Sequence, residues 1–259
     1  MVTVSKFDSD LKNLDLFEVF YCENTIAIKI SHPEFVILYL SETSRIELMR
    51  GLYLITNDDP LELLLDKLEI ALSTGHIAIL QYRRKKVAKA DQSFEVEQIK
   101  VLCETYQVPF VINDDLALAN QFDLGVHLGQ SDGEISEAVS RLSSSAVIGR
   151  TCLNSLALAE KAIAEGATYI AFGAVYATAT KPEAGNVGIE VIKQARQKFN
   201  TPICAIGGLT VENSKIVIES GADLCAVISD ILGRSVQDIP ARINAWAALF
   251  ADTSSAVNV

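Results

Sequence analysis

The sequence predicts an α/β fold, a closed (β/α)8 TIM barrel preceded by an N-terminal extension of uncertain structure. Three observations favour this class. From residue 51 onward, short apolar β-prone runs alternate with helical patterns. Eight such runs fit into about 200 residues, the short end of the usual size range of this barrel. Polar residues follow nearly every run, where the strands of a barrel carry its active site. An open doubly wound sheet is the alternative.

Each predicted strand is a short apolar run bounded by turn residues. The eight runs are residues 51–56, 77–81, 109–112, 124–127, 146–149, 168–172, 202–206 and 224–228. The clearest helical stripe between them consists of Leu61, Leu64, Leu65 and Leu68, whose spacing places four apolar side chains on one face. Pro60 suits the first position of that helix, because a backbone N–H would have no partner there.

Three glycines are expected to end helices, namely Gly75, Gly166 and Gly221. Many helices close with a left-handed residue, and glycine adopts that conformation without steric cost. The barrel domain is predicted to span residues 51–252, which leaves 1–50 as the extension and 253–259 as a flexible tail.

The composition argues against several classes of protein. The chain has 259 residues, of which 49% are hydrophobic and 21% charged, enough for a substantial core. A net charge of -11 argues against nucleic acid as the main partner, because binding its backbone needs a basic surface. The five cysteines show no C-x-x-C pairing, so a reducing cytoplasm is the expected setting. No apolar run approaches the roughly 18 residues of a membrane span, and no export signal is found.

Two acidic motifs stand at the ends of neighbouring predicted strands. Asn113-Asp114-Asp115 closes one apolar run, and Asp132 follows the next. Basic motifs follow strands on either side of them in sequence, at Gln81–Lys85 and at Thr178–Lys181. Carboxylates suit a divalent cation, and the basic groups suit a polyanion. Together these motifs predict a pyrophosphate held with a divalent cation.

A second anion site is predicted after the last two strands. Gly207-Gly208 follow the seventh strand and Ser229 follows the eighth. Glycines let backbone N–H groups approach a phosphate closely, and the next helix adds its positive end. This is the usual phosphate site of such barrels.

With these motifs the chain resembles thiamine phosphate synthase, also called thiamine-phosphate pyrophosphorylase. The resemblance covers residues 51 to about 250 and rests on seven motifs in family order: Gly51–Thr56, Gln81-x-Arg83-x-Lys85, Asn113-Asp114-Asp115, Gly125–Asp132, Thr178-x-Thr180-Lys181, Ala205–Gly208 and Val227–Ser229. Any one of them alone would be weak, but seven in order at consistent spacing are more than chance would give.

The resemblance implies a reaction and a cofactor. The aminopyrimidine methyl group of hydroxymethylpyrimidine pyrophosphate would move to the ring nitrogen of a thiazole phosphate, giving thiamine phosphate and pyrophosphate. By the same resemblance Asp114 and Asp132 would hold Mg²⁺, the expected cofactor. Arg83 and Lys85 would add fixed positive charge, as catalytic residues that also bind the substrate.

The remaining contacts are implied in the same way. Gln81 and Asn113 would orient the pyrimidine or the pyrophosphate by hydrogen bonds. Lys181, with Thr178 and Thr180, would lie on a loop that closes over the substrates and excludes water. The thiazole phosphate would be bound through backbone N–H groups of Gly207, Gly208, Ile228 and Ser229, with the serine hydroxyl as an extra donor.

Several residues also have purely structural interpretations. Asp115 is expected to cap the next helix. His127 is expected to be a hydrogen-bonded structural residue rather than a base. Arg84 and Lys86 are expected to be surface charges. Three cysteines are expected to be small core residues, Cys152, Cys204 and Cys225.

The chain departs from the family pattern in two loops. After strand 5 the family has a serine near the pyrophosphate, whereas this chain has Thr151, which keeps the hydroxyl and is the predicted catalytic substitute. Arg150, just before it, would either add a phosphate contact or face outward. After strand 8 the family has alanine or glycine behind the serine, whereas this chain has Asp230. That charge would weaken phosphate binding unless its side chain points away.

Residues 1–50 lie outside the resemblance. They contain two β-prone runs, Ile26–Ile30 and Phe35–Leu40, which would form a small β-hairpin appendage. Because Met49 stands where family members often begin, the first 48 residues could equally be an upstream extension that activity does not need.

Two other functions stay open. A thiazole tautomerase shares the barrel, but the histidine it uses for proton transfer would fall at Leu153, which cannot transfer protons. A non-catalytic phosphate-ligand sensor would bind the same ligands without turnover. The expected partners are the two substrates, with neither nucleic acid nor membrane, and self-association into a homo-oligomer is open.

Overall fold

The computed structural model describes residues 17–22, 25–30, 37–40, 49–177 and 187–254. It divides into two compact units, Met1–Leu48 and Met49–Val259. The polar motifs that predict a functional site all belong to the second unit.

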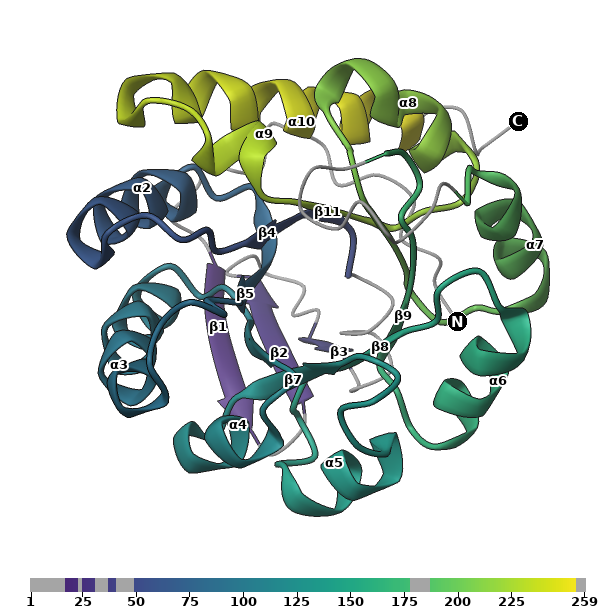
Figure 1. Ribbon diagram of the computed structural model, residues 1–259, viewed down its shortest axis with the longest axis horizontal. Helices are drawn as coiled ribbons and strands as arrows, with labels where there is room; N and C mark the ends of the chain where they lie inside the picture. Colours follow the sequence, from purple (N-terminus) through teal and green to yellow (C-terminus); the bar gives the residue numbers. More distant parts are fainter. Residues whose placement is uncertain (1–16, 23–24, 31–36, 41–48, 178–186, 255–259) are drawn as a thin grey trace. The chain divides into compact units, whose positions relative to one another are not determined.

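Eight parallel strands of the second unit close into a barrel in the order β10-β11-β4-β5-β6-β7-β8-β9 (Figure 1). They are β4 (Gly51–Ile55), β5 (Ile77–Tyr82), β6 (Phe110–Asn113), β7 (Gly125–Leu128), β8 (Ile148–Thr151), β9 (Tyr169–Phe172), β10 (Ile203–Ile206) and β11 (Leu224–Val227). Closure confirms the predicted (β/α)8 class and excludes the open sheet. All eight predicted strands are present, although β8 lies later in the chain than the predicted 146–149.

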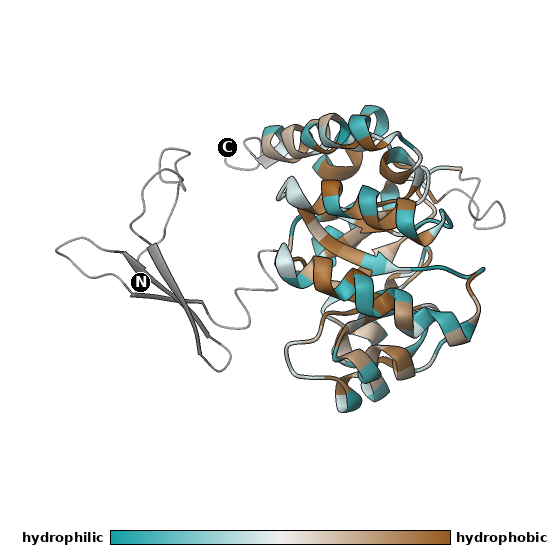
Figure 2. Ribbon diagram, turned by 90° about the vertical axis from the view of Figure 1, so that its left-hand side faces the viewer, coloured by the Kyte–Doolittle hydropathy of each residue, from teal (hydrophilic) through white to brown (hydrophobic). Residues whose placement is uncertain are grey.

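Helices alternate with the strands and surround the barrel (Figure 1). They are α2 (Leu61–Ser73), α3 (Lys89–Thr105), α4 (Leu116–Phe122), α5 (Ile135–Arg141), α6 (Leu156–Ala164), α7 (Glu190–Lys198), α8 (Val211–Glu219), α9 (Ser229–Leu232), the 3-10 helix η3 (Val236–Asp238) and α10 (Ile239–Ser254). Figure 2 shows hydrophobic and hydrophilic residues alternating along these helices, as expected where one face packs against the strands. Helix α10 continues beyond residue 252, the predicted end of the domain.

The residues at the helix ends agree with the predictions, except that Pro60 lies one position earlier than expected. Gly75, Gly166 and Gly221 all have positive φ, at 71°, 102° and 107°, just beyond the last residues of α2, α6 and α8. This confirms them as helix-ending glycines. Pro60 precedes α2 as its N-cap instead of occupying the first helical position, because its ψ of 143° is extended.

The interior of the barrel forms a core of its own, separate from the layer between strands and helices. Alternate strand residues point inward, and the buried members of this inner core are Tyr53, Ile55, Ile79, Val111, Tyr169, Ala171, Cys204, Leu224 and Ala226. Cys204, Cys152 and Cys225 are all buried, which confirms their predicted place in the core. Toward the carboxyl ends of the strands the inward positions become polar, and there the predicted site begins.

The first unit contains a three-stranded antiparallel sheet in the order β1-β2-β3. Its strands are β1 (Phe17–Cys22), β2 (Thr25–Ile30) and β3 (Ile37–Leu40). The sequence predicted strands in the segments that β2 and β3 occupy, and it missed β1. Among the helices that the structure describes, in either unit, none combines the length and apolar character that a membrane-spanning segment needs.

Candidate active site

The predicted site residues that the structure describes lie at one end of the barrel. Each belongs to the carboxyl end of a strand or to the loop after it, and because the strands are parallel these ends share one rim. These residues are Gln81, Arg83, Lys85, Asn113, Asp114, Asp132, Thr151, Gly207, Gly208, Ile228 and Ser229. The other three, Thr178, Thr180 and Lys181, lie outside the described residues.

A chain of hydrogen bonds crosses the barrel interior below this rim. Gln81 Nε2 donates to the hydroxyl of Tyr53 over 2.8 Å, and the hydroxyls of Tyr53 and Tyr169 are 2.7 Å apart. His127 Nδ1 lies 2.7 Å from the Tyr169 hydroxyl, and its Nε2 lies 2.8 Å from Thr151 Oγ1. His127 is therefore hydrogen-bonded within the barrel, as predicted. The chain fixes the orientation of Gln81 and Thr151, two predicted substrate contacts on opposite sides of the mouth.

The two tyrosines were missed by the sequence analysis. Each lies in the middle or at the start of an apolar run, where an aromatic residue is expected in any case. Burial raises the pKa of Tyr53 and of Tyr169 far above the ordinary value of a phenol. Both hydroxyls therefore stay protonated, and they act here as hydrogen-bonding groups.

Two carboxylates, Asp114 and Asp132, meet on the rim after β6 and β7. Asp114 has a φ of 66°, and its backbone N–H donates to the carbonyl of His127 over 2.8 Å. Asp132 Oδ2 accepts from the backbone N–H of Gly129 over 3.0 Å. This local folding turns both side chains toward each other.

Their pKa values record this proximity. Burial alone would raise the pKa of Asp114, but the hydrogen bond and charge of Lys85, whose Nζ is 3.0 Å from Asp114 Oδ2, lower it below the usual value. The pKa of Asp132 is raised, first by burial and then by the negative charge of Asp114. Two adjacent carboxylates of this kind attract a cation.

The two carboxylates fit Mg²⁺ only if water or substrate oxygens supply the remaining ligands. In the described part of the chain, no group of three or more His, Cys, Asp or Glu side chains lies close enough to hold a metal ion. Mg²⁺ in phosphate-handling sites uses one or two carboxylates, with water and substrate oxygens completing its shell. Asp114 and Asp132 match that requirement.

The basic loop after β5 faces the same part of the rim. Arg83, Lys85, Asn113 and Asp114 all line one cavity of about 420 Å³. The Thr56 hydroxyl accepts from the backbone N–H of Arg83 over 2.8 Å, which ties this loop to the neighbouring strand. The structure therefore brings together four of the residues that the resemblance assigns to the pyrophosphate, the pyrimidine or the metal ion.

Arg84, expected at the surface, is instead buried and only 6% exposed. Its Nε and Nη2 donate to the Glu95 carboxylate of α3 at 2.8 and 3.1 Å, and its Nη1 donates to the carbonyls of Asn57 and Asp59 at 2.9 and 2.6 Å. Tyr82 also donates to Glu95, over 2.7 Å. The prediction was wrong because the loop after β4 and helix α3 together offer the guanidinium a complete set of acceptors, which the local sequence does not reveal. The other expected surface charge, Lys86, is exposed.

The network of Arg84 continues toward α9. Lys67 of α2, also buried, donates to Asp59 Oδ2 over 2.7 Å and to the carbonyl of Leu232 over 2.6 Å. Asn57 Nδ2 adds a bond to the same carbonyl over 3.3 Å. The loops after β4 and β5 are thus joined to the helix that follows β11.

The carboxyl end of β8 places two residues on different sides of the barrel wall. Thr151 points into the interior chain, whereas Arg150 is buried outside the strand and donates through Nη1 to the carbonyl of Gly133 over 2.6 Å. Of the two alternatives for Arg150, the outward orientation holds. Leu153 follows with a φ of 55° and a half-exposed side chain.

Gly207 and Gly208 form a turn that only glycine fits. Their φ values are 105° and 63°, and a Cβ would lie 2.5 Å from the Ala174 Cβ at Gly207 and 2.6 Å from the Ala177 carbonyl oxygen at Gly208. Among the described residues, none accepts a hydrogen bond from the backbone N–H of Gly208 or of Ser229. These donors remain available to an anion.

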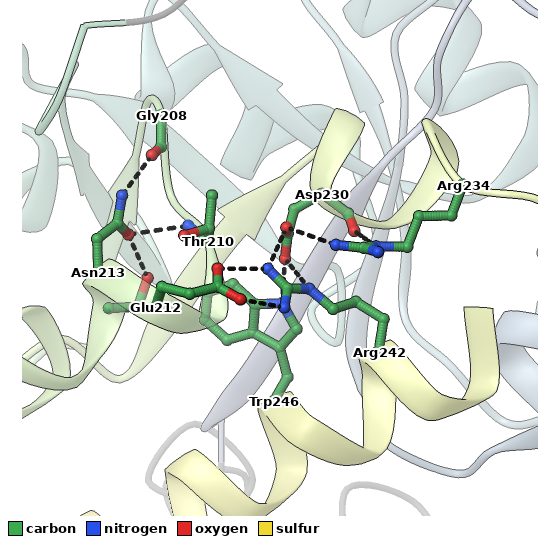
Figure 3. A network of polar contacts seen from close by, with 9 residues as sticks. Gly208, Thr210, Glu212, Asn213, Asp230, Arg234, Arg242 and Trp246 are labelled. Atoms are coloured by element: carbon green, nitrogen blue, oxygen red, sulfur yellow. Dashed lines mark hydrogen bonds and ion pairs between the residues drawn. The ribbon is translucent and has the colours of Figure 1, made fainter. Parts of the chain in front are cut away.

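Asp230, which the sequence placed beside the phosphate site, points away from it. Its carboxylate accepts from Arg242 Nε and Nη2 at 2.9 and 2.5 Å and from Trp246 Nε1 at 2.7 Å (Figure 3). Both partners lie on α10 and carried no signal in the sequence. Asp115, finally, caps α4 as predicted, accepting from the backbone N–H of Leu118 over 3.0 Å.

Comparison with known proteins agrees with this arrangement. The sequence model of one protein family, described as thiamine monophosphate synthase, matches residues 52–231. The chain is similar to a thiamine phosphate pyrophosphorylase from Pyrococcus furiosus, with 26% identity and a TM-score of 0.70, over 81% of this chain and 98% of that chain.

Two further solved structures show the same fold. A thiamine phosphate pyrophosphorylase from Bacteroides thetaiotaomicron is 17% identical, with a TM-score of 0.52, over 78% of this chain and 98% of that chain. The (S)-3-O-geranylgeranylglyceryl phosphate synthase from Thermoplasma acidophilum is 12% identical, with a TM-score of 0.60, over 82% of this chain and 97% of that chain.

Proposed function

Because the chain belongs to the thiamine monophosphate synthase family, we propose that it joins hydroxymethylpyrimidine pyrophosphate to 4-methyl-5-(2-phosphoethyl)thiazole, giving thiamine phosphate and pyrophosphate. The family implies a transferase of thiamine biosynthesis. The observation that carries the finer proposal is the cavity where Arg83, Lys85, Asn113 and Asp114 meet. Its mixture of fixed cations and carboxylate suits a pyrophosphate that leaves with a metal ion.

In the proposed reaction the bond to pyrophosphate breaks before the new bond forms, because the aminopyrimidine spreads the developing positive charge over its ring. The main task of the protein is then to stabilise the leaving group. Arg83 would bind it as a planar fork and Lys85 as a point charge. Lys85 is paired with Asp114 in the structure, but its side chain is 56% exposed, so it can turn toward a bound pyrophosphate.

Asp114 and Asp132 would hold the Mg²⁺ cofactor. When bound, that ion neutralises pyrophosphate oxygens and so makes the leaving group more stable. The mutual effect of the two carboxylates on their pKa values supports this assignment.

The interior chain of hydrogen bonds gives Gln81 and Thr151 defined roles. The Gln81 amide nitrogen donates to Tyr53, and the proposed chain continues in the same direction through Tyr169 and His127 to Thr151. In this arrangement His127 Nε2 would donate to Thr151 Oγ1, and the threonine hydroxyl proton would be left to bind an anion. At the other end the Gln81 carbonyl oxygen would accept from the pyrimidine amino group, while Asn113 would contact the pyrimidine or the pyrophosphate.

The thiazole phosphate would bind after β10 and β11, through Gly207, Gly208, Ile228 and Ser229. The available N–H groups of Gly208 and Ser229 support this part of the proposal. Thr178, Thr180 and Lys181, outside the described residues, would close over the substrates and exclude water, which would otherwise trap the pyrimidine cation.

A reducing, cytoplasmic setting belongs to the same proposal. The four described cysteines, Cys103, Cys152, Cys204 and Cys225, are all free thiols.

The test is to mix the full chain with both substrates and Mg²⁺ and to follow thiamine phosphate by its oxidation to a fluorescent product. We expect product that EDTA abolishes and that Asp114→Ala lowers by at least about a hundredfold, because the variant loses half of the metal site. Asp66→Ala, at an exposed position of α2, is the matched control and should keep full activity.

Binding of either substrate without any product would overturn the enzyme proposal and favour the phosphate-ligand sensor. The tautomerase alternative gains no support, because Leu153 has no group that can transfer a proton.

A further inference from the structure

Two carboxylates lie in the first turns of the helices that follow the proposed phosphate-binding strands. Glu212 is in the first turn of α8, after β10, and Asp230 is in the first turn of α9, after β11. A single cation from α10, Arg242, binds both of them (Figure 3). Its Nη1 and Nη2 donate to Glu212 Oε1 and Oε2 at 2.6 and 2.7 Å, while Nε and Nη2 donate to the two oxygens of Asp230 at 2.9 and 2.5 Å.

The α8 side of this contact reaches the glycine turn. Thr210 and Asn213 form a capping box at the start of α8, on either side of Glu212. Asn213 Nδ2 also donates to the carbonyl of Gly208 over 2.8 Å. Arg242 is therefore connected to the Gly208 turn through the first turn of α8.

The connection from Arg242 to the start of α9 is shorter. Asp230 is the chain neighbour of Ser229, whose backbone N–H is available to an anion. The Asp230 side chain is only 5% exposed, and it is paired with Arg242 and hydrogen-bonded to Trp246. A second cation, Arg234, lies 3.6 Å away.

This arrangement solves an electrostatic problem. A phosphate at Ser229 would be repelled by a buried, unpaired carboxylate one residue away, because water cannot screen the charge there. Arg242 supplies the compensating charge and holds the carboxylate on the α10 side. Because its guanidinium also binds Glu212 through two parallel bonds, it fixes the first turn of α8 relative to that of α9.

We propose that Arg242 is a positioning residue for the phosphate end of the site, where it keeps Asp230 neutralised and fixes the two phosphate-binding turns relative to each other. This inference rests on the proposed function, since it assumes that the thiazole phosphate binds at these turns. Arg242 itself does not touch the substrate.

The experiment is calorimetric titration of the full chain with thiazole phosphate, followed by steady-state kinetics. We expect Arg242→Met to raise the Kd and KM for thiazole phosphate by about tenfold or more, because a buried charge near the phosphate loses its closest cation. The KM for the pyrimidine pyrophosphate should stay unchanged, since its proposed contacts lie at the ends of β5 to β8 and in the loops after them. The kcat at saturating thiazole phosphate should also stay within about twofold, because positioning acts on binding.

Lys215→Met is the matched control. Lys215 pairs with Asp252 over 2.9 Å and so joins the same two helices, α8 and α10, through exposed side chains. Its removal should leave both KM values unchanged.

The double variant Arg242→Met, Asp230→Ala removes the buried charge together with its partner. We expect it to bind thiazole phosphate more tightly than Arg242→Met, because the repulsion is gone, but about threefold or more below wild type, because the two turns are no longer fixed to each other. It decides the question if the single variant does not fold. Wild-type affinity in either folded variant, or a double variant that binds no more tightly than the folded single variant, would overturn the inference. If the unmodified chain binds no thiazole phosphate, the proposed function fails instead.

Discussion

Tyr53 and Tyr169 place two phenol groups inside a barrel, where side chains without polar atoms would pack as easily. Each hydroxyl is paired, so neither leaves a buried polar group unsatisfied. Both hydroxyls lie between Gln81 and His127. Through these hydrogen bonds the two tyrosines orient Gln81 on one side of the barrel mouth and, through His127, Thr151 on the other. The inner residues of the barrel therefore support the proposed chemistry without taking part in it.

Tyr169→Phe tests this orienting role. The change removes the hydroxyl between Tyr53 and His127, so Thr151 loses its defined orientation, and we expect kcat to fall by about tenfold. The free energy of unfolding should fall by about 1 to 3 kcal/mol, because a buried ring nitrogen loses a partner. The same change at Tyr106, outside the barrel, serves as the control in both the kinetic assay and urea unfolding. Unchanged kcat would contradict the orienting role.

The buried cysteines provide a second test at the residue scale. Burial raises the pKa of Cys103 and of Cys152 to about 12, and it also raises the pKa of Cys204 and Cys225. A raised pKa leaves almost no thiolate at pH 8, so these four thiols should resist iodoacetamide in the native protein and react after denaturation. Mass spectrometry of the labelled peptides measures this. Rapid native labelling of any of the four would show that its surroundings open.

The burial of Arg84 could not be predicted from the residues around it in the sequence. Within Arg83-Arg84-Lys85-Lys86 nothing distinguishes the one side chain that is buried, because its acceptors come from the loop after β4 and from α3. The acidic and basic residues of the rim were easier to place, since they follow apolar runs directly. A partner eleven positions away on a helix face leaves no comparable pattern.

At the scale of elements, the buried contacts of Arg84, Glu95 and Lys67 join the loops after β4 and β5 to α9. The loop after β5 carries Arg83 and Lys85 of the leaving-group half, and α9 begins at Ser229 of the phosphate half. Tight coupling between them means that the leaving-group side and the phosphate side form one rigid frame. Both cations of this connection, Arg84 and Lys67, are buried, so the loss of one partner is costly.

Arg84→Met is expected to lower the free energy of unfolding by about 3 to 5 kcal/mol, because it leaves the Glu95 carboxylate buried without its cation. Urea unfolding followed by circular dichroism measures this. Adding Glu95→Gln should restore part of the loss. Lys86→Met, at the exposed neighbour, should change stability by no more than about 0.5 kcal/mol. A loss as small as that in Arg84→Met would show that the ion pair contributes little.

The strands were predictable because each is an apolar run of β-prone residues bounded by turn residues. The shift at β8 has a physical cause, since Arg150 and Thr151 are polar and were taken for the loop, although one packs outside the wall and the other inside. The helix ends at Gly75, Gly166 and Gly221 were predictable from backbone sterics alone. The contacts of α10 with Asp230 could not be predicted from the sequence. They join two segments that become neighbours only when the barrel closes.

On the scale of the whole molecule, the second unit has its own closed sheet and its own core. Every described residue of the proposed site belongs to it. The first unit, with its three-stranded sheet, contributes none of them. The barrel unit therefore contains both the core and every described residue of the proposed site.

Deletion of residues 1–48 should leave a folded, active domain, because the core and the site both lie within Met49–Val259. The thiamine phosphate assay and thermal unfolding of the truncated chain check this. We expect kcat and both KM values within about twofold of the full chain. A folded but inactive truncation would show that the first unit contributes to the site.

The two ends of the proposed site differ in how many amino-acid substitutions they can tolerate. In the proposed site, recognition of the leaving group would depend on side chains such as Arg83 and Lys85, so a single substitution there would change the recognition directly. At Gly207 and Gly208 any larger residue clashes with neighbouring atoms. The glycine turn therefore tolerates few substitutions, whereas the residues around the leaving group can be replaced one at a time. Proteins that evolve from this one should keep the phosphate-binding turn and should differ in the leaving group that they accept.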